Sequence, residues 1–289
     1  MRQIVVPDAV RSGNHEIIVS VSGGKDSTAT VLALREAGVS CRLVFADTGW
    51  EAPETYAHLE HLREKLGPID VVSAERTMAD AIRHRAGFPS RMQRWCTREL
   101  KVLPLREYHD RFDSTVSVLG IRADESESRS SLPEWEDSDR WGGLVWRPIL
   151  RWSVADVLAI HHRHGVEVNP LYKRGHNRVG CYPCIYAAKD EIRLVAEHSP
   201  SRIDEIRSLE AECTSARAAR NAETPGRYAH EQATFFMAID RETMRPNDID
   251  EVVSWSRTAR GGRQLTLLQS DPEGGCFRWG MCEPPSGEK

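Results

Sequence analysis

The stretch EIIVSVSGGKDSTATVLAL, residues 16–34, joins a run of β-branched residues to a helix-forming run through Ser-Gly-Gly-Lys-Asp-Ser. Gly23 and Gly24 allow backbone N–H groups to approach an anion, and the N-terminus of the following helix adds a partial positive charge. Lys25 adds a full charge, while Asp26 suits such a site if Mg²⁺ bridges it to phosphates. The stretch therefore predicts a phosphate-binding turn, with a simple helix-capping turn as the alternative.

The common P-loop pattern, G-x-x-x-x-G-K-[ST], is not present. Val19 stands at the position of its first glycine, and Asp26 follows the lysine in place of Ser or Thr. A kinase-type or GTPase-type loop is therefore not expected, and the identity of the phosphate compound has to come from the rest of the chain.

The bulk composition indicates a globular protein with no membrane span. Of 289 residues, 40% are hydrophobic and 28% are charged, and no apolar run approaches the ~18 residues of a spanning helix. The first residues lack the apolar core of a signal peptide, so we expect a cytoplasmic protein.

The net charge is −4, but residues 83–111 carry eight Arg or Lys against three acids. That patch faces either an anionic substrate or solvent.

Short β-rich runs alternate with helical patterns, which predicts an α/β fold: a parallel, twisted sheet with helices on both faces. The expected strands are residues 17–21, 41–46, 69–73 and 115–120, and the expected helices between them are 27–37, 53–66 and 97–111. Because ligands bind at the carboxyl ends of parallel strands, the polar loops after the first, second and fourth strands should meet over one edge.

The middle of the chain is less regular. Residues 122–143 are polar and rich in Ser, which predicts a long loop or flap. A helix is expected between a Ser153 N-cap and a stop at Gly165. Its histidines, including His161 and His164, are expected at a solvated helix end.

The last hundred residues have a different pattern from the rest of the chain, because helical segments are no longer separated by β-rich runs. A helical region is expected over residues 187–221, with a break at Ser199-Pro200. We therefore expect a nucleotide-binding α/β domain over residues 1–186, and a mostly helical C-terminal region with a cysteine-containing tail over 187–289.

Five segments in order resemble the phosphoadenylyl sulfate (PAPS) reductase family of the PP-loop ATP pyrophosphatase superfamily, whose fold is adenine nucleotide alpha hydrolase-like. They are SGGKDS, DTGWEAPET, WCTRELKVLPL, GIRADESESR and the run from RPILRW to GCYPC, and they cover residues 16–186. The resemblance implies binding of an adenine nucleotide, with ATP and Mg²⁺ as the expected ligands.

The resemblance also implies roles for individual residues. A pyrophosphate or phosphosulfate group would be held by Ser22, Gly23, Gly24, Lys25, Asp26 and Ser27, and the nucleotide would lie near Asp47, Thr48 and Gly49. Arg122 and Arg129 would meet anionic oxygens, which guanidinium groups bind well. The expected catalytic residues are Lys25, Asp26, Arg122 and Arg129.

The chain has seven cysteines, and GCYPC is compatible with a redox pair, a zinc site, an iron–sulfur site or two free thiols. Some relatives hold a 4Fe–4S cluster on a Cys-Cys pair and a later Cys-x-x-Cys; here Trp95 precedes Cys96. The resemblance thus implies cluster ligands at Cys96, Cys181 and Cys184. The expected fourth ligand is Cys282, with Cys276 as its alternative, and Zn²⁺ is the alternative metal.

The end of the chain bears on the reaction. Relatives that reduce sulfonucleotides carry a terminal Glu-Cys-Gly segment with a nearby His, and GMCEPPSGEK lacks both. The intact loop favours ATP-dependent adenylation of an acceptor followed by sulfur transfer, as in the DNA phosphorothioation ATPases. The alternatives are a PAPS or adenylyl sulfate reductase, a sulfate adenylyltransferase-like subunit and a nucleotide sensor. The expected partners are a sulfur donor such as a cysteine desulfurase and a nucleic-acid acceptor.

Overall fold

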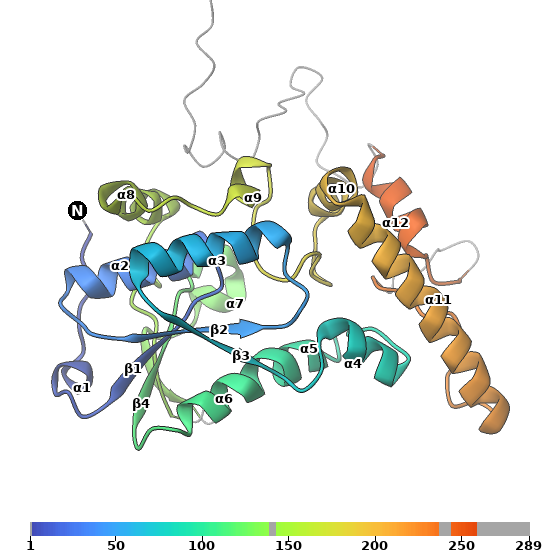
Figure 1. Cartoon of the computed structure of the whole chain (residues 1–289), viewed down its shortest axis with the longest axis horizontal. Coiled ribbons are helices and arrows are strands. Elements are labelled where there is room, and N and C mark those ends of the chain that lie inside the picture. Colours follow the sequence, from blue (N-terminus) through green and yellow to red (C-terminus); the bar gives the residue numbers. More distant parts are fainter. Residues whose placement is uncertain (1, 139–142, 237–243, 259–289) are drawn as a thin grey trace, which may run out of the picture.

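The computed structural model describes residues 2–138, 143–236 and 244–258, which form a six-stranded sheet in the order β3-β2-β1-β4-β6-β5 (Figure 1). The strands are β1 (Glu16–Ser20), β2 (Arg42–Asp47), β3 (Ile69–Ser73), β4 (Thr115–Leu119), β5 (Trp135–Ser138) and β6 (Gly143–Trp146). All neighbouring pairs are parallel except β5 with β6. The order reverses direction at β1, so the loop after β1 opens at the switch point of the sheet.

Helices cover both faces of this sheet. Ile17 and Val19 of β1 pack with α2 (Lys25–Glu36), α3 (Pro53–Leu66) and α8 (Val154–His164), which lie on one side (Figure 1). Ile18 points the other way and packs with α6 (Leu103–His109). Successive strand residues are therefore buried on opposite faces, as in parallel sheets with two helical layers. The expected α/β fold is confirmed.

A second core joins the loops at the carboxyl edge to the helical C-terminal region. It is built around α4 (Met78–Arg85), α10 (Lys189–His198), α11 (Pro200–Glu223) and α12 (Ile249–Ser256). Trp50, in the loop after β2, is fully buried in this core and stacks on Phe235 with ring centroids 5.9 Å apart. The expected break at Ser199-Pro200 separates α10 from α11.

The expectation of one long loop at residues 122–143 was wrong. The described part of that range holds the 3-10 turn η2 (Ala123–Glu125), the short helix α7 (Glu127–Ser130) and strand β5. β5 is polar because it is an edge strand and only half buried, so its pattern resembles that of a loop.

The expected helix over residues 97–111 begins two residues earlier and is irregular. It consists of α5 (Trp95–Thr97), the π-helical turn η1 (Arg98–Val102) and α6, with Pro104 inside the first turn of α6. Two further short helices are α1 (Asp8–Arg11) and α9 (Pro170–Lys173). None of the described helices is long and apolar enough to cross a membrane.

Candidate functional site

The loop between β1 and α2 is shaped by its two glycines. Gly23 has a φ of 72°, and a Cβ there would come within 2.9 Å of the Thr55 side chain. Gly24 is the N-cap of α2 and has no side chain, so no N-cap side chain occupies the first amides of the helix, which is where an anion binds. Ser27 Oγ donates to the Gly24 carbonyl at 3.0 Å and accepts from the Ser22 N–H at 3.2 Å. These bonds fix the conformation of the loop.

Three charged side chains meet at this helix N-terminus, and all are buried. Lys25 Nζ lies 3.0 Å from Asp26 Oδ2, and Arg122 Nε donates to Asp26 Oδ1 at 2.5 Å. Arg122 also contacts Asp124 at 2.5 Å. Two cations therefore surround one carboxylate beside the loop, and both belong to side-chain types that bind phosphate oxygens well.

Arg129 lies on α7, farther out. It forms an ion pair with Glu125, and Glu125 Oε2 accepts the Arg122 N–H at 2.8 Å. The Arg129 side chain is 38% exposed. Arg129 is thus connected to the buried charges through Glu125 and the backbone of Arg122.

His161 of α8 contacts the backbone at the end of the β1–α2 loop. The expectation that it lies at a solvated helix end was wrong. It is buried, its Nε2 lies 2.8 Å from the Lys25 carbonyl, and its Nδ1 lies 2.9 Å from the Val166 carbonyl. Burial lowers the pKa of His161. His164 lies at the exposed end of the helix and contacts Glu36 at 2.8 Å.

Residues before and within α9 hold the other side of the loop. Asn169 is fully buried, and its Nδ2 donates to the Gly23 carbonyl at 3.2 Å. Tyr172 Oη accepts the Lys25 N–H at 3.3 Å, and Lys25 Nζ lies 4.8 Å from the centre of the Tyr172 ring. The loop is therefore held at its start by Asn169 and at its end by Tyr172 and His161.

The loop after β2 is also tightly bonded. Asp47 Oδ1 accepts from the Gly49 N–H at 2.8 Å and from the Tyr56 hydroxyl at 2.7 Å. Gly49 has a φ of 66°, which favours glycine, and a Cβ there would lie 3.0 Å from Thr77. Thr48 is buried and donates its hydroxyl to Glu51 at 2.8 Å. Thr48 thus fixes this loop through Glu51.

Glu51 links this loop to the cysteines. It is buried, and its Oε1 lies 3.7 Å from Lys101 Nζ. Burial opposes a charge on Lys101, but the charges of Cys181 and Glu51 outweigh it, so the pKa of Lys101 is raised. Lys101 is therefore the cation shared by Glu51 and Cys181.

Cys96, Cys181 and Cys184 lie together at the edge of the second core, and each is partly exposed. Burial raises the pKa of the Cys96 thiol, and the nearby Cys181 raises it further. Burial also raises the pKa of Cys181, against the pull of Lys101. The described residues contain no group of three or more His, Cys, Asp or Glu that could hold a metal ion. Cys276 and Cys282 lie outside the described residues.

Backbone contacts join the β2 loop to the Cys-x-x-Cys segment. Glu51 and Cys181 form an isolated antiparallel bridge, and the Tyr182 N–H donates to the Trp50 carbonyl at 2.8 Å. Trp50 Nε1 donates to the Pro183 carbonyl at 3.0 Å. The candidate nucleotide site and the three thiols are thus parts of one connected structure.

Four residues of this site were not anticipated: Glu51, His161, Asn169 and Tyr172. Asn169 precedes a proline and is the N-cap of α9, and this N-cap role can be predicted from the local sequence. The contacts of Asn169 with Gly23 and of His161 with Lys25 join residues more than 130 positions apart. Sequence spacing alone gives no sign of such contacts.

Comparisons with known proteins bear on the family of this chain. The model of the phosphoadenosine phosphosulfate reductase domain matches residues 16–187. An uncharacterized 37.8 kDa protein of Escherichia phage 186 is 34% identical over 310 residues, which cover 87% of this chain and 91% of that protein. An adenosine 5'-phosphosulfate reductase of Geobacillus kaustophilus is 25% identical, with 63% of this chain and 78% of the relative covered.

A solved structure shows the same fold. The phosphoadenylyl-sulfate reductase of Candida auris, in a phosphate complex, aligns with a TM-score of 0.50 and 17% identity, covering 62% of this chain and 89% of that chain. At this identity the likeness concerns the fold alone. Because the family model matches more than half of the chain, this protein belongs to the phosphoadenosine phosphosulfate reductase domain family.

Proposed function

We propose that the protein binds ATP–Mg²⁺ at residues 22–27 and transfers the adenylyl group to an acceptor oxygen, after which a sulfur nucleophile displaces AMP. The observation that carries this proposal is the joining of the loop after β2, which lies on the nucleoside side of the candidate site, to the three thiols. The joining runs through the contact of Glu51 with Lys101 and the bridge of Glu51 to Cys181. A nucleotide site alone would not need a thiol group beside it.

In the first step the acceptor oxygen attacks the α-phosphorus of ATP, and the bond from that phosphorus to the pyrophosphate oxygen breaks. The amides at the start of α2 would hold the phosphates, while Lys25 and Arg122 offset the charge that develops on the leaving pyrophosphate. Asp26 would hold the Mg²⁺, since carboxylate oxygens are its usual protein ligands. Arg129 would contact the outer side of the phosphates from α7. The nucleoside part of ATP would lie against Asp47, Thr48 and Gly49.

The second step needs a sulfur atom near the adenylated acceptor. Cys96, Cys181 and Cys184 are suited to this position, and a 4Fe–4S cluster on them would take a fourth ligand from Cys282, or else Cys276. Such a cluster would supply sulfur or electrons to the transfer, and Zn²⁺ would be a structural alternative. A donor such as a cysteine desulfurase would reload the sulfur as a persulfide. After its outer sulfur has displaced AMP, a neighbouring thiol would release the thiolated product by forming a disulfide, which an external thiol reductant would reduce.

The products of ATP test this function. With ATP, Mg²⁺ and a sulfur donor present, we expect AMP and pyrophosphate, measured by ion-exchange chromatography. Lys25→Ala should lower AMP formation by about 10²–10³-fold, as for other electrostatic stabilisers. Lys173→Ala, on the exposed surface of α9, is the matched control and should keep full activity. ADP and phosphate as main products would rule out adenylation.

A second candidate is sulfonucleotide reduction, and relatives named adenosine 5'-phosphosulfate reductase favour it. This reaction needs no ATP and releases sulfite when a thiol reductant is supplied. Sulfite release from adenylyl sulfate or PAPS, together with no consumption of ATP, would replace the proposed function by this one.

The thiol site is tested by its absorbance. Protein purified without oxygen should be brown, with absorbance near ~400 nm, the usual charge-transfer region of iron–sulfur centres. Cys181→Ser should remove the colour, while Cys41→Ser, at the sheet core, should keep it. Colourless protein that holds one zinc would exclude the cluster.

A further inference from the structure

One side of the helical segment from α5 to α6 is a surface of arginines. A hollow of about 310 Å³ on this side is lined by Arg94, Thr97, Arg98, Val102, Leu103 and Arg106. The three arginine side chains that line it are all exposed. We call Arg91, Arg94, Arg98, Arg106 and Tyr186 the arginine face.

No carboxylate neutralises this surface in the described part of the chain. The ion pairs of residues 83–111 involve Arg83, Arg85 and Lys101, and none involves an arginine of the arginine face. Arg94 makes one polar contact here, with the Thr97 hydroxyl at 3.2 Å. The arginines of the face are therefore available to a ligand that brings its own negative charge.

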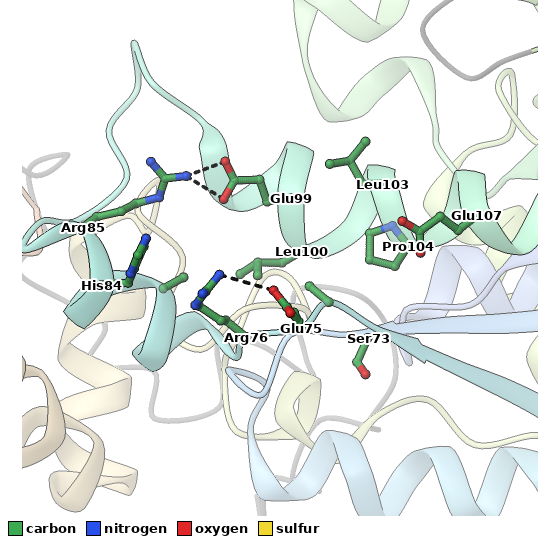
Figure 2. A pocket seen from close by; sticks show the side chains of 12 residues that line it. Ser73, Glu75, Arg76, His84, Arg85, Glu99, Leu100, Leu103, Pro104 and Glu107 are labelled. Carbon is green, nitrogen blue, oxygen red and sulfur yellow. Dashed lines mark hydrogen bonds and ion pairs between the residues drawn. The ribbon is translucent and has the colours of Figure 1, made fainter.

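A neighbouring side of the same segment, which shares Leu103 with the arginine face, is electrostatically different (Figure 2). It borders a hollow of about 470 Å³ in which Arg85 points at Glu99, with nitrogen–oxygen distances of 2.6 and 2.8 Å. Arg76 pairs with Glu75 at 3.5 Å on the floor of that hollow. One helical segment thus separates a charge-balanced hollow from a cationic one, and only the second suits an anion.

The arginine face also contains an aromatic ring beside the cysteines. The guanidinium groups of Arg91 and Arg94 lie 5.5 and 5.2 Å from the centre of the Tyr186 ring. Tyr186 is 36% exposed and follows Cys184 by two residues, while Arg94 precedes Cys96 by two. The two chain segments that carry the thiols therefore meet at this Arg–Tyr stack.

The chemistry of these groups fits a chain of phosphates with bases. Guanidinium groups bind phosphate oxygens in a planar, two-bond arrangement, and single-stranded bases stack on aromatic and guanidinium planes. Arg94 and Arg106 are twelve positions apart, about 18 Å along a helix. That span exceeds one nucleotide and matches several consecutive phosphates.

Other occupants fit less well. Residues 259–289 of this chain contain four basic and four acidic residues, so they offer no net charge to the arginine face. Large apolar side chains near it are limited, among the described residues, to Met92 and Leu103, with 93% and 38% exposure. Two such residues are too few for the apolar centre of a protein interface.

We propose that the arginine face binds the phosphate backbone of a single-stranded nucleic acid and places it beside Cys96, Cys181 and Cys184. The binding itself stands on the contacts above. The identification of the strand as the acceptor rests on the proposed function, because only sulfur transfer gives the strand a reason to lie next to the thiols.

Fluorescence anisotropy with the full chain and a labelled single-stranded DNA or RNA of about 20 nucleotides tests the proposal. The wild type should bind, and its affinity should fall steeply between about 50 and 200 mM salt. The triple variant Arg94→Gln, Arg98→Gln, Arg106→Gln should bind at least about tenfold more weakly. Its slope of log K against log salt should be smaller by about 2, because each lost phosphate contact removes about 0.7.

The matched control replaces three arginines that the structure pairs with carboxylates: Arg83, Arg163 and Arg207. The variant Arg83→Gln, Arg163→Gln, Arg207→Gln loses the same charge and should bind within about threefold of the wild type, since surface pairs contribute little. Equal weakening in both triples would show a non-specific charge effect and overturn the proposal. Absence of binding by the wild type at low salt, or binding only to phosphatidylserine vesicles, would overturn it as well.

The two proposals fail separately, because the binding assay contains no ATP. Arginine-dependent binding without any AMP formation would refute the proposed function and leave the arginine face intact. The opposite result is that AMP forms with a strand as acceptor, and that the triple variant of Arg94, Arg98 and Arg106 binds this strand as tightly as the wild type. That result would refute the arginine face and leave the proposed function intact.

Discussion

Asp26 is the residue on which the charge balance of the loop depends. Its carboxylate lies between Lys25 and Arg122, and all three side chains are buried. Without a ligand, the carboxylate offsets two cations whose burial would otherwise be costly. When ATP–Mg²⁺ binds under the proposed function, phosphate oxygens take over those cations and the carboxylate is freed for the metal.

This exchange predicts opposite effects of one substitution in two conditions. Asp26→Asn should weaken ATP binding about tenfold or more with Mg²⁺ present, because a metal ligand is lost. In EDTA the same variant should bind ATP as well as the wild type or better, since Lys25 and Arg122 no longer face a competing carboxylate. Isothermal titration calorimetry measures both affinities, and a thermal melt checks the fold.

Asp124→Asn is the control for this prediction. Asp124 contacts Arg122, but its side chain is 52% exposed, so removing its charge should change ATP affinity little in either condition. An equal loss for Asp26→Asn with and without Mg²⁺ would show that Asp26 acts through the shape of the loop alone.

At this scale the sequence predicts the residues of the loop and misses those that hold it. Gly23, Gly24, Lys25 and Asp26 form one local pattern whose chemistry is readable from neighbouring residues. His161 is different, because polar residues follow it in sequence and its burial depends on the packing of α8 against α2. Position 161 follows Val157 by four residues and so lies on the buried side of α8, but this spacing does not show that the side chain contacts the Lys25 carbonyl.

Among the elements, the crossing of β4 and α2 leaves no room for a side chain at Gly120. A Cβ on Gly120 would lie 2.6 Å from Ser27 Cα and 2.9 Å from the Asp26 carbonyl oxygen. Backbone atoms cannot rotate away as a side chain can, so the helix itself would have to move. The position of the loop relative to β4 is therefore set by this glycine.

Gly120→Ala should lower the free energy of unfolding by about 3 kcal/mol, the upper part of the usual range for overpacking. It should also weaken ATP binding, because α2 carries the loop. Gly165→Ala is the control: Gly165 has a φ of 59° and a ψ of 33°, with nothing within 4 Å of its added Cβ, so only about 1–2 kcal/mol of backbone strain is expected. Urea denaturation separates the two, and equal losses would contradict the steric explanation.

The elements that sequence reasoning predicts well are those with strong local patterns. The bounds of β3 and α3 match the expected ranges, and α8 begins after Ser153 and ends at Gly165 as expected. β5 and β6 were missed, because they are four residues each and β5 alternates weakly at the edge. Four residues are too few for periodicity to separate a strand from a loop.

Across the whole molecule, several buried histidines resist protonation. Burial lowers the pKa of His58, His109 and His176 to about 4, from an ordinary value of 6.5. As pH falls below 6.5, these histidines become protonated in the unfolded chain but stay neutral in the folded chain. The free energy of unfolding therefore falls until about pH 4. At pH 5 each such histidine costs about 2 kcal/mol.

Glu210 opposes this trend. Burial raises its pKa to about 7, so the folded chain binds a proton that the unfolded chain has already lost, and acidification from pH 7 to 5 restores about 2 kcal/mol. The three histidines outweigh this single carboxyl, and we expect lower stability at pH 5 than at pH 7. Urea denaturation at both values tests it. His176→Gln should reduce the difference, and unchanged stability across the range would contradict the burial argument.

Under the proposed function, the short bridge between Glu51 and Cys181 would couple nucleotide binding to sulfur loading in one thermodynamic cycle. The bonds of Trp50 to Tyr182 and Pro183 would strengthen this coupling. If loading the thiols shifts the Cys181–Pro183 backbone, it shifts the loop that follows β2 as well. Reciprocity then requires that ATP change the affinity of the thiols for their cargo by the same factor. Loaded and spent molecules would thus differ in ATP affinity, and the nucleotide would select those ready to react without any separate regulator.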